Sequence, residues 1–478
     1  MKVLFVNPST SFEQIYGDWD LSALDTYTPP LGIMHIASYI REHGHEPHIL
    51  DLQVGEWGID GVVESICALQ PDVLGLSSMT INCLNAKRIS EELRNQGFQS
   101  PIVMGGAHIT AVPEITLREF TAVDYAVLGE GEETFLELLE TLGSNGPIQN
   151  VKGIAWRRAP GEIVINDRRP FIQDLDKLPF PAWDLLDDFP RSYPSSLLES
   201  KRVPAAGIMT SRGCPFHCTF CDNTVFGTRV RNFSADYSLK MIRHLIDNYQ
   251  IKDLMFFDDN FLLSKEKLSK ICNGIIDESL DLTWFCIAHA KSMKKERLEL
   301  ARRAGCWFVE MGIESGNDDI LKEIRKTTDT AEIARAAENA HQSGLMTKGN
   351  FIFGFPGDTA KTLEESVQFA LDIDIDFFQQ SFLTIWPGCE ISSQIETNSP
   401  TDKHSINDWK MLAHQRVTFV PSALTEAELI SISKTAFRKF YLRPKIVFRL
   451  FPLFMTRRGL KLGIVAFRVF LQTILRRK

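Results

Sequence analysis

The first 145 residues alternate short apolar runs with stretches whose apolar residues recur at helical spacing. The apolar runs predict buried strands at residues 3–6, 48–51, 72–77, 102–105 and 124–128. The helical spacing is clearest at residues 31–43, 86–95 and 132–142. Short apolar strands that alternate with helices are typical of a doubly wound parallel sheet, which binds ligands at the carboxyl ends of its strands. An α/β domain is therefore predicted for residues 1–145.

The same alternation resumes near residue 204 and continues to about residue 390. It predicts strands at residues 206–210, 254–257, 284–288, 307–313, 349–353 and 378–384. Six strands, most of them followed by helices, predict a partial or complete parallel (β/α) barrel over residues 201–395. The active face of such a barrel is formed by the carboxyl ends of its strands.

The segment between the two predicted domains, residues 146–200, is expected to be a connector. Residues 153–156 and 163–165 flank Ala159-Pro-Gly161 and predict a hairpin. The proline-punctuated run 178–183 is expected to be a surface segment that passes between the domains. Residues 396–478 predict a helical C-terminal region.

Composition and charge narrow the class of protein. The chain has 478 residues, of which 44% are hydrophobic and 24% charged, as in ordinary globular proteins. We expect neither a signal peptide nor a transmembrane helix, because no apolar run is long enough. Nine cysteines without a secretory signal favour a reducing, cytoplasmic location. The net charge of -9 argues against a general nucleic-acid binder.

The charge is unevenly distributed, since residues 441–478 contain ten Lys or Arg and no Asp or Glu. Apolar residues are mixed with these basic residues. Such a composition suits a helix that lies on an anionic membrane surface, which gives a possible peripheral contact with the inner membrane. Alternatively, the apolar face packs on the barrel and the charges are solvated.

Cys214, Cys218 and Cys221 directly follow the first predicted barrel strand, separated by three residues and then by two. Three thiolates can hold three corners of a [4Fe-4S] cluster and leave the fourth iron open to a small molecule. A structural zinc site needs four ligands, usually as two spaced pairs, and the next cysteine, Cys272, stands alone. A disulfide among the three would be strained. The spacing therefore favours a cluster, and the reduced cluster would require low oxygen.

With Phe220 before the last cysteine, this motif resembles the signature of the radical S-adenosylmethionine (SAM) superfamily. The resemblance implies that the reduced cluster cleaves SAM reductively to a 5′-deoxyadenosyl radical, which abstracts hydrogen from an unactivated carbon. It also implies an electron donor such as flavodoxin or ferredoxin.

Loops after later barrel strands supply candidate SAM ligands. Asp258 and Asp259 follow the second strand and can accept hydrogen bonds from the ammonium group of SAM, although the superfamily usually has Gly-Gly-Glu here. Alternatively, one of them caps the next helix. Glu314 and Ser315 follow the fourth strand and are expected to contact the ribose or methionine part, unless Ser315 caps the following helix. Gly354 follows the fifth strand, where backbone can approach adenine.

Small residues at the strand ends of the first domain let a large ligand approach the backbone. They are Ser77, Ser78, Thr80, Gly105, Gly106 and Gly129, followed by Glu130. With the run 29–33 and the connector run 178–182, these loops resemble radical SAM enzymes that carry an N-terminal, Rossmann-like cobalamin-binding domain. The loop after the first strand lacks Asp-x-His-x-x-Gly, so the resemblance implies base-off cobalamin without a protein His ligand. A domain that had lost cobalamin would show the same absence.

Cobalamin-dependent methyl transfer is the leading functional hypothesis, acting on a small-molecule or lipid substrate. A radical oxidoreductase, such as the anaerobic magnesium-protoporphyrin ester cyclase of the resembled family, and a sensor or electron carrier are the alternatives. Cys389, just beyond the sixth strand, could face the substrate and donate hydrogen, although such a cysteine is more often a buried apolar residue. The other cysteines are expected to pack in the core: Cys67, Cys83, Cys272, Cys286 and Cys306.

Overall fold

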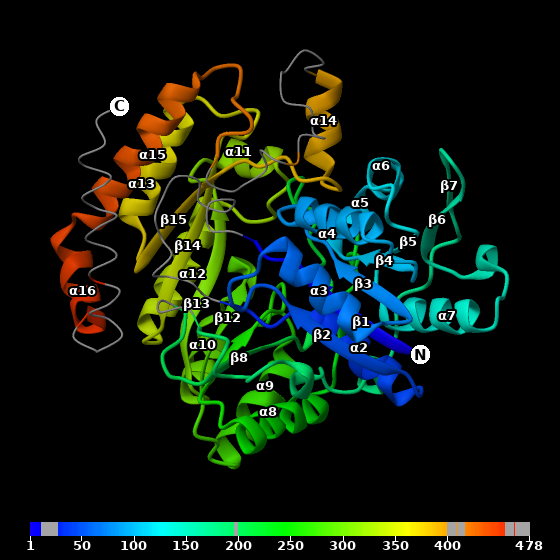
Figure 1. Ribbon diagram of the computed structural model, residues 1–478. Helices are drawn as coiled ribbons and strands as arrows, with labels where there is room; N and C mark the ends of the chain where they lie inside the picture. The colour runs from blue at the N-terminus through cyan, green and yellow to red at the C-terminus, as the bar shows by residue number, and fades with distance from the viewer. Residues whose placement is uncertain (11–26, 196–198, 399–408, 410–415, 455–462, 464–478) are drawn as a thin grey trace.

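The structure, a computed structural model, describes residues 1–10, 27–195, 199–398, 409, 416–454 and 463. A seven-stranded sheet in the order β2-β1-β3-β4-β5-β6-β7 forms the N-terminal part (Figure 1). The five predicted strands are present and parallel: β1 (Lys2–Asn7), β2 (Glu46–Asp51), β3 (Val73–Ser77), β4 (Ile102–Gly105) and β5 (Tyr125–Val127). The predicted hairpin, β6 (Ile154–Ala159) and β7 (Glu162–Ile165), pairs antiparallel with β5 and extends this sheet.

Helices cover both faces of the first sheet. Leu4 and Phe5 enter different hydrophobic clusters because successive strand residues point to opposite faces. The face of Phe5 is covered by α2 (Leu31–Glu42) and α7 (Glu132–Gly143). The face of Leu4 is covered by α3 (Ile59–Leu69), α4 (Cys83–Asn95), α5 (Ala107–Ala111) and α6 (Pro113–Glu119). The prediction of a doubly wound sheet is confirmed.

The second sheet is a partial barrel of six parallel strands whose two edges are β8 and β15. Its strands are β8 (Ala205–Ile208), β11 (Asp253–Phe256), β12 (Thr283–Ala288), β13 (Cys306–Glu314), β14 (Met346–Phe353) and β15 (Phe377–Phe382). The helices between them are α8 (Ala235–Tyr249), α9 (Lys265–Asp277), α10 (Lys295–Arg303), α11 (Asp318–Glu323), α12 (Thr330–Gln342) and α13 (Ala360–Asp372). All six predicted strands are confirmed.

Four residues of the run 178–183 are buried and Pro179 and Phe180 are partly buried, which corrects the expectation of a surface segment. Ala182 donates its backbone N–H to the carbonyl of Met34 in α2 at 3.2 Å. Trp183 is 1% exposed and belongs to the same hydrophobic cluster as Leu239 of α8. Ala182 and Trp183, which follow the second proline, therefore pack between helices of the two sheets. Short 3₁₀ helices lie in the connections: η2 (Ile148–Asn150), η3 (Leu175–Lys177), η4 (Trp183–Leu185) and η5 (Ala290–Ser292).

Beyond the barrel, the described part of the chain contains three helices joined by irregular segments. The helices are α14 (Glu390–Asn398), α15 (Glu426–Tyr441) and α16 (Pro444–Phe454), and α15 packs against α13 and β15. The basic residues expected after position 454 lie outside the described residues. No helix of the described part is long and apolar enough to cross a bilayer.

Candidate functional site

The three cluster cysteines lie on the loop that leaves β8 through a two-residue strand, β9 (Ser211–Arg212). The backbone N–H of Cys221 donates to the carbonyl of Cys218 at 3.1 Å. Burial raises the pKa of the Cys218 thiol, while the Lys326 ammonium lowers it. Three thiols on one loop are the donor set of a cluster with an open iron. In the described part of the chain, no three His, Cys, Asp or Glu side chains form a site for a single metal ion.

Asp258 holds the segment that precedes the cysteines. Its carboxylate is fully buried and accepts the backbone N–H of Thr210 at 2.9 Å and the Thr210 hydroxyl at 2.8 Å. It also accepts the Ser211 hydroxyl and, at 3.2 Å, the ammonium of Lys267. Both oxygens of Asp258 thus accept hydrogen bonds from protein donors, and the SAM contact expected of this residue stays a prediction. Asp259 is an exposed residue, yet partial desolvation and the neighbouring charge of Asp258 raise the pKa of its carboxyl. Burial raises the pKa of the Cys214 thiol, and the charge of Asp259 adds to this rise.

Glu314, at the end of β13, forms a buried ion pair with Lys326, whose ammonium lies 2.9 Å from Glu314 Oε1. Although burial opposes it, Glu314 and the Cys218 thiol raise the pKa of Lys326. A Cβ on Gly312 would lie 2.3 Å from the same Glu314 oxygen, so only glycine leaves room for the pair. Sequence reasoning missed Lys326, because a lysine in a loop after α11 carries no local signal of its ion partner.

Ser315 and Gly354 occupy the loops where the sequence predicted SAM contacts, but their polar groups have protein partners. Ser315 Oγ lies 3.1 Å from Ser366 Oγ, and the helix that follows is capped by Asn317 rather than by Ser315. Gly354, with φ of +100°, donates its N–H to Asp358 at 2.9 Å. Burial raises the pKa of Asp358 to about 6. The Ser315 hydroxyl and the Gly354 N–H are thus engaged by protein atoms, and a contact with SAM would use other atoms of these residues.

A cavity of about 140 Å³ opens at the carboxyl ends of β1, β3, β4 and β5, between the sheet and helices α2 and α7. Its lining includes Ser77, Gly75, Gly105, Gly106, Gly129, Glu130 and Gly131. A Cβ on Gly106 would lie 2.5 Å from the Ser78 carbonyl oxygen, and one on Gly131 would lie 2.5 Å from Ile36 Cδ1. Gly106 and Gly131 therefore allow close packing beside the cavity that a side chain would disturb.

Two of the residues predicted to hold cobalamin do not line this cavity. Ser78 is fully buried, and its carbonyl accepts the backbone N–H of His108 at 3.1 Å. The Thr80 hydroxyl lies 3.2 Å from His108 Nδ1. The Ser78 carbonyl and the Thr80 hydroxyl thus contact His108 of α5, while the buried Ser78 hydroxyl has no hydrogen-bond partner. Burial lowers the pKa of His108 to about 4.

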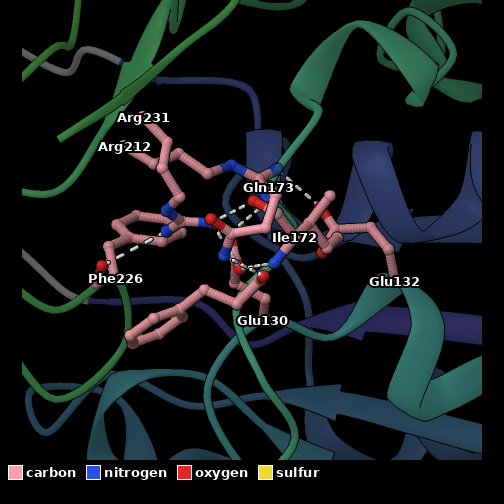
Figure 2. A network of polar contacts seen from close by, with 8 residues as sticks. Glu130, Glu132, Ile172, Gln173, Arg212, Phe226 and Arg231 are labelled. Atoms are coloured by element: carbon pink, nitrogen blue, oxygen red, sulfur yellow. Dashed lines mark hydrogen bonds and ion pairs between the residues drawn. The ribbon is translucent and has the colours of Figure 1, made fainter. Parts of the chain in front are cut away.

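The opposite wall of the cavity comes from residues 210–232, which contain the three cysteines and are called the cysteine segment. Arg212, Val225 and Phe226 of this segment line the cavity. Arg212 forms ion pairs with Glu130 and Glu132 inside this wall (Figure 2). Although burial opposes it, Arg212 lowers the pKa of Glu132. Glu130 lines the cavity, and arginines engage both of its carboxylate oxygens, so its expected contact with cobalamin stays a prediction.

A second cavity, of about 260 Å³, shares Gly129 and Glu130 with the first. Its lining also includes Arg168 and Phe171 of the connector and Thr224, three residues after Cys221. Empty space therefore lies on two sides of the Gly129–Glu130 loop, next to the cysteine segment.

Cys389 supports the cysteine loop from the end of the barrel. Its Sγ–H donates to the carbonyl of Phe220 at 3.0 Å, directly before Cys221. Burial raises the pKa of the Cys389 thiol to about 12, so the thiol is protonated at neutral pH. Its role toward a substrate stays a prediction. Cys83, Cys272, Cys286 and Cys306 are buried as expected, and Cys67 is partly buried.

A ligand cavity on a doubly wound sheet, facing a three-cysteine loop on a partial barrel, defines a two-domain cofactor enzyme. Two family models match the chain, the B12 binding domain over residues 21–139 and the Radical SAM superfamily over residues 208–370. An uncharacterized methyltransferase of Pyrococcus horikoshii is 30% identical over 452 residues, which cover 94% of each chain. The chain belongs to the radical SAM enzymes that carry a B12-binding domain.

Other relatives span nearly the whole chain. An anaerobic magnesium-protoporphyrin IX monomethyl ester cyclase of Rubrivivax gelatinosus is 26% identical and aligns with 92% of this chain and 78% of its own. The cobalamin-dependent SAM radical enzyme OxsB, solved with aqua-cobalamin and SAM bound, matches with a TM-score of 0.74 and 18% identity, over 99% of this chain and 75% of its own. The radical SAM methyltransferase TsrM of Kitasatospora setae matches with a TM-score of 0.69 and 18% identity, over 89% and 80%. These structures share the fold.

Proposed function

We propose that the enzyme transfers a methyl group to an unactivated carbon of a small-molecule or lipid substrate, with cobalamin as the methyl carrier. The observation that carries this proposal concerns the cavity of about 140 Å³, here called the glycine-rich cavity, whose lining comes from both domains. Gly106 and Gly131 face it from the first sheet, and Val225 and Phe226 face it from the cysteine segment. A cofactor held in this cavity lies against the cysteine segment, as joint use of cobalamin and an iron–sulfur cluster requires.

The cavity fits part of cobalamin. An apolar cavity of about 150 Å³ is large enough to hold an aromatic ring. The cavity here, of about 140 Å³ with Phe5, Ile33 and Phe135 in its walls, therefore suits the nucleotide base of base-off cobalamin rather than the corrin ring. We assign no imidazole to cobalt, since the loop after β1 lacks the Asp-x-His-x-x-Gly motif.

Bound together, the cluster, SAM and cobalamin supply a hydrogen-abstracting radical and a transferable methyl group. The residues of the chain bind and orient these groups. In the proposal Cys214, Cys218 and Cys221 hold three irons, and the exposed carboxylate of Asp259 accepts hydrogen bonds from the ammonium of SAM. Lys326 pairs with the buried carboxylate of Glu314 beside the cysteines.

An oxidative ring closure is the second candidate. It is favoured by the relatives named as anaerobic magnesium-protoporphyrin IX monomethyl ester cyclases, while methyl transfer is favoured by the relative from Pyrococcus horikoshii and by a cytidylyl-2-hydroxyethylphosphonate methyltransferase of Streptomyces wedmorensis, 28% identical over 92% of this chain. S-adenosylhomocysteine separates the two, because a cobalamin methyl carrier must be remethylated by SAM.

The test uses full-length protein reconstituted anaerobically with iron, sulfide and hydroxocobalamin, then given reduced flavodoxin or ferredoxin and SAM. Bound cobalt, 5′-deoxyadenosine and S-adenosylhomocysteine together support methyl transfer. Cobalt and 5′-deoxyadenosine without S-adenosylhomocysteine support the ring-closing alternative. Replacing Cys218 by Ala should abolish both nucleoside products, whereas the control Cys67→Ala, in the partly buried α3 position, should not. A protein that binds the cluster but cleaves no SAM contradicts both candidates and favours a sensor or electron carrier.

We further propose that α16 contacts an anionic lipid surface. Phe448 and Phe451 are 78% and 56% exposed on this helix, while Ile446 and Leu450 pack into the barrel's hydrophobic cluster. The sequence from residue 441 onward is rich in Lys and Arg and has no acidic residue, which complements anionic headgroups.

Sedimentation with phosphatidylglycerol vesicles tests this contact. We expect the wild-type chain to bind, Phe448→Ser combined with Phe451→Ser to bind less, and the exposed-site control Ile165→Ser to bind normally. Equal binding of all three variants, or loss of binding only on removal of residues 455–478, contradicts a role for α16. A change of oligomeric state in the double variant would instead assign the face to a second copy of the chain.

A further inference from the structure

Two buried arginines and two buried glutamates form a closed network between the first sheet and the cysteine segment (Figure 2). Arg212 donates from Nη1 to Glu130 at 2.7 Å and from Nη2 to Glu132 at 2.5 Å. Arg231 donates from Nη1 to both oxygens of Glu130, at 2.8 and 2.7 Å. None of the four side chains is more than 5% exposed. The network is therefore shielded from solvent and from salt.

The connector completes this network with its backbone. Ile172 donates its N–H to Glu130 Oε2 at 2.9 Å, and its carbonyl accepts Nη1 of Arg231 at 2.8 Å. The Arg231 guanidinium lies 4.7 Å from the centre of the Phe171 ring. Three segments that are distant in sequence are thus tied together at one point.

The charges of the network balance only when the two domains meet. Arg231, on β10 (Arg231–Asn232), lies directly opposite Arg212 on β9, where two like charges repel each other. Glu130 and Glu132, from the loop after β5 and the first turn of α7, neutralise the pair. Loss of one glutamate leaves a buried positive charge without compensation, which is strongly unfavourable.

Arg212 lies between the cavity and the cysteine loop along the chain. It lines the glycine-rich cavity and stands two positions before Cys214. The intervening Gly213 has φ of +88°, and a Cβ there would lie 2.6 Å from the carbonyl oxygen of Arg229. Because this stretch of backbone has so little room, a displacement of Arg212 is passed on to Cys214.

We propose that Arg212 is a positioning residue, and that its network with Glu130, Glu132 and Arg231 sets the placement of the cysteine loop relative to the cofactor in the glycine-rich cavity. The inference rests on the proposed function for the identity of that cofactor. It gives Glu130 a role in joining the domains, in addition to its place in the lining of the cavity.

Hydrogen exchange of the full-length protein without cofactors is the first test. Glu132→Gln removes a charge and keeps the shape of the side chain, and Arg212→Met removes the guanidinium that bridges the two glutamates. Arg118→Met is the control, since Arg118 pairs with Glu114 on an exposed helix face. In both network variants, exchange in residues 210–214 should accelerate about tenfold or more, while β3 and β13 stay unchanged, because local opening is decoupled from global unfolding. The control should match the wild type. Acceleration over the whole chain, or none, overturns the proposal.

The second test places a spin on each cofactor. Protein loaded with the reduced cluster and cob(II)alamin should show a dipolar interaction between them by electron paramagnetic resonance. In Glu132→Gln we expect iron and cobalt contents equal to wild type but a weaker or more widely distributed interaction, with Arg212→Lys intermediate. An unchanged interaction overturns the positioning role. Absence of cobalt from the wild-type protein refutes the proposed function instead, and the exchange data then decide on their own whether the network holds the cysteine segment.

Discussion

Replacement of Asp258 by Asn is the sharpest test of how the cysteine loop is held. The carboxylate is completely buried and receives the Thr210 N–H on Oδ2 and three further donors on Oδ1, from Thr210, Ser211 and Lys267. Asparagine has a single side-chain oxygen, which can accept either the donor now on Oδ2 or the donors now on Oδ1. Its NH₂ group then faces a donor in the place of the other oxygen, so at least one hydrogen bond is replaced by a donor–donor contact.

The expected cost is about 3–5 kcal/mol in the free energy of unfolding, the usual penalty for removing one partner of a buried ion pair. A net loss of about 1.5–3 kcal/mol for one hydrogen bond to a charged group forms part of it. Burial already lowers the pKa of Lys267, and Asp258 opposes this shift. Without the carboxylate, Lys267 must therefore give up its proton or remain as an unpaired buried charge.

A double-mutant cycle with Asp258→Asn, Lys267→Met and the double variant measures the coupling by denaturant unfolding. We expect the double variant to be more stable than the sum of the single losses by about 1–3 kcal/mol. Glu266→Gln is the matched control on the same helix, because Glu266 pairs with Lys270 on the exposed side, at 2.8 Å, and should change nothing measurable. A loss below about 1 kcal/mol for Asp258→Asn, or additive effects, would refute the reasoning, since a buried pair cannot be broken so cheaply.

Three further predictions concern the cofactor loops. Gly131→Ala is allowed by its backbone angles but pushes Ile36 toward the cavity, so cobalamin affinity should fall about tenfold or more, as overpacking costs about 1–3 kcal/mol. Anaerobic titration checks this, and an unaltered affinity would contradict it. Asp259→Asn should weaken SAM binding to the reconstituted protein by about tenfold without changing stability, because a charge-assisted hydrogen bond is lost from an exposed site; equal SAM affinity in equilibrium binding would remove Asp259 from the site. Asp358 has its pKa raised to about 6 in the folded state, so the native protein holds that proton more tightly and the stability from this group falls as pH rises from about 4 to 6. The free energy of unfolding of Asp358→Asn should therefore rise relative to that of the wild type by up to about 3 kcal/mol from about pH 4 to pH 6. A difference in unfolding free energy that does not depend on pH would argue against the raised pKa.

The strands of both sheets and the position of the cysteine loop could be predicted because their signals are local. A run such as Val3–Val6 is apolar on both sides, which indicates a strand covered by helices on two faces. The cysteines follow the first barrel strand directly, so any fold that contains this strand places them at its carboxyl end.

The roles of neighbouring acids could not be predicted in the same way. Asp258 and Asp259 are identical in type and adjacent, yet one is fully buried and the other exposed. The difference depends on Thr210 and Lys267, which reach Asp258 from other parts of the chain. Burial of Trp183 in a proline-rich run likewise depends on α2 and α8, which meet only after folding.

By itself, the sequence determined the two α/β domains, the cluster motif and the class of cofactor enzyme, because periodicity and motif spacing are properties of short stretches of chain. Only the tertiary structure decided that Glu130 pairs with Arg212 and Arg231, more than 80 residues away, and that Gly106 and Gly131 border a cavity shared with the cysteine segment. The physical reason is that ion pairs and cavities depend on the relative placement of distant segments, and no local pattern records which buried charge will meet which.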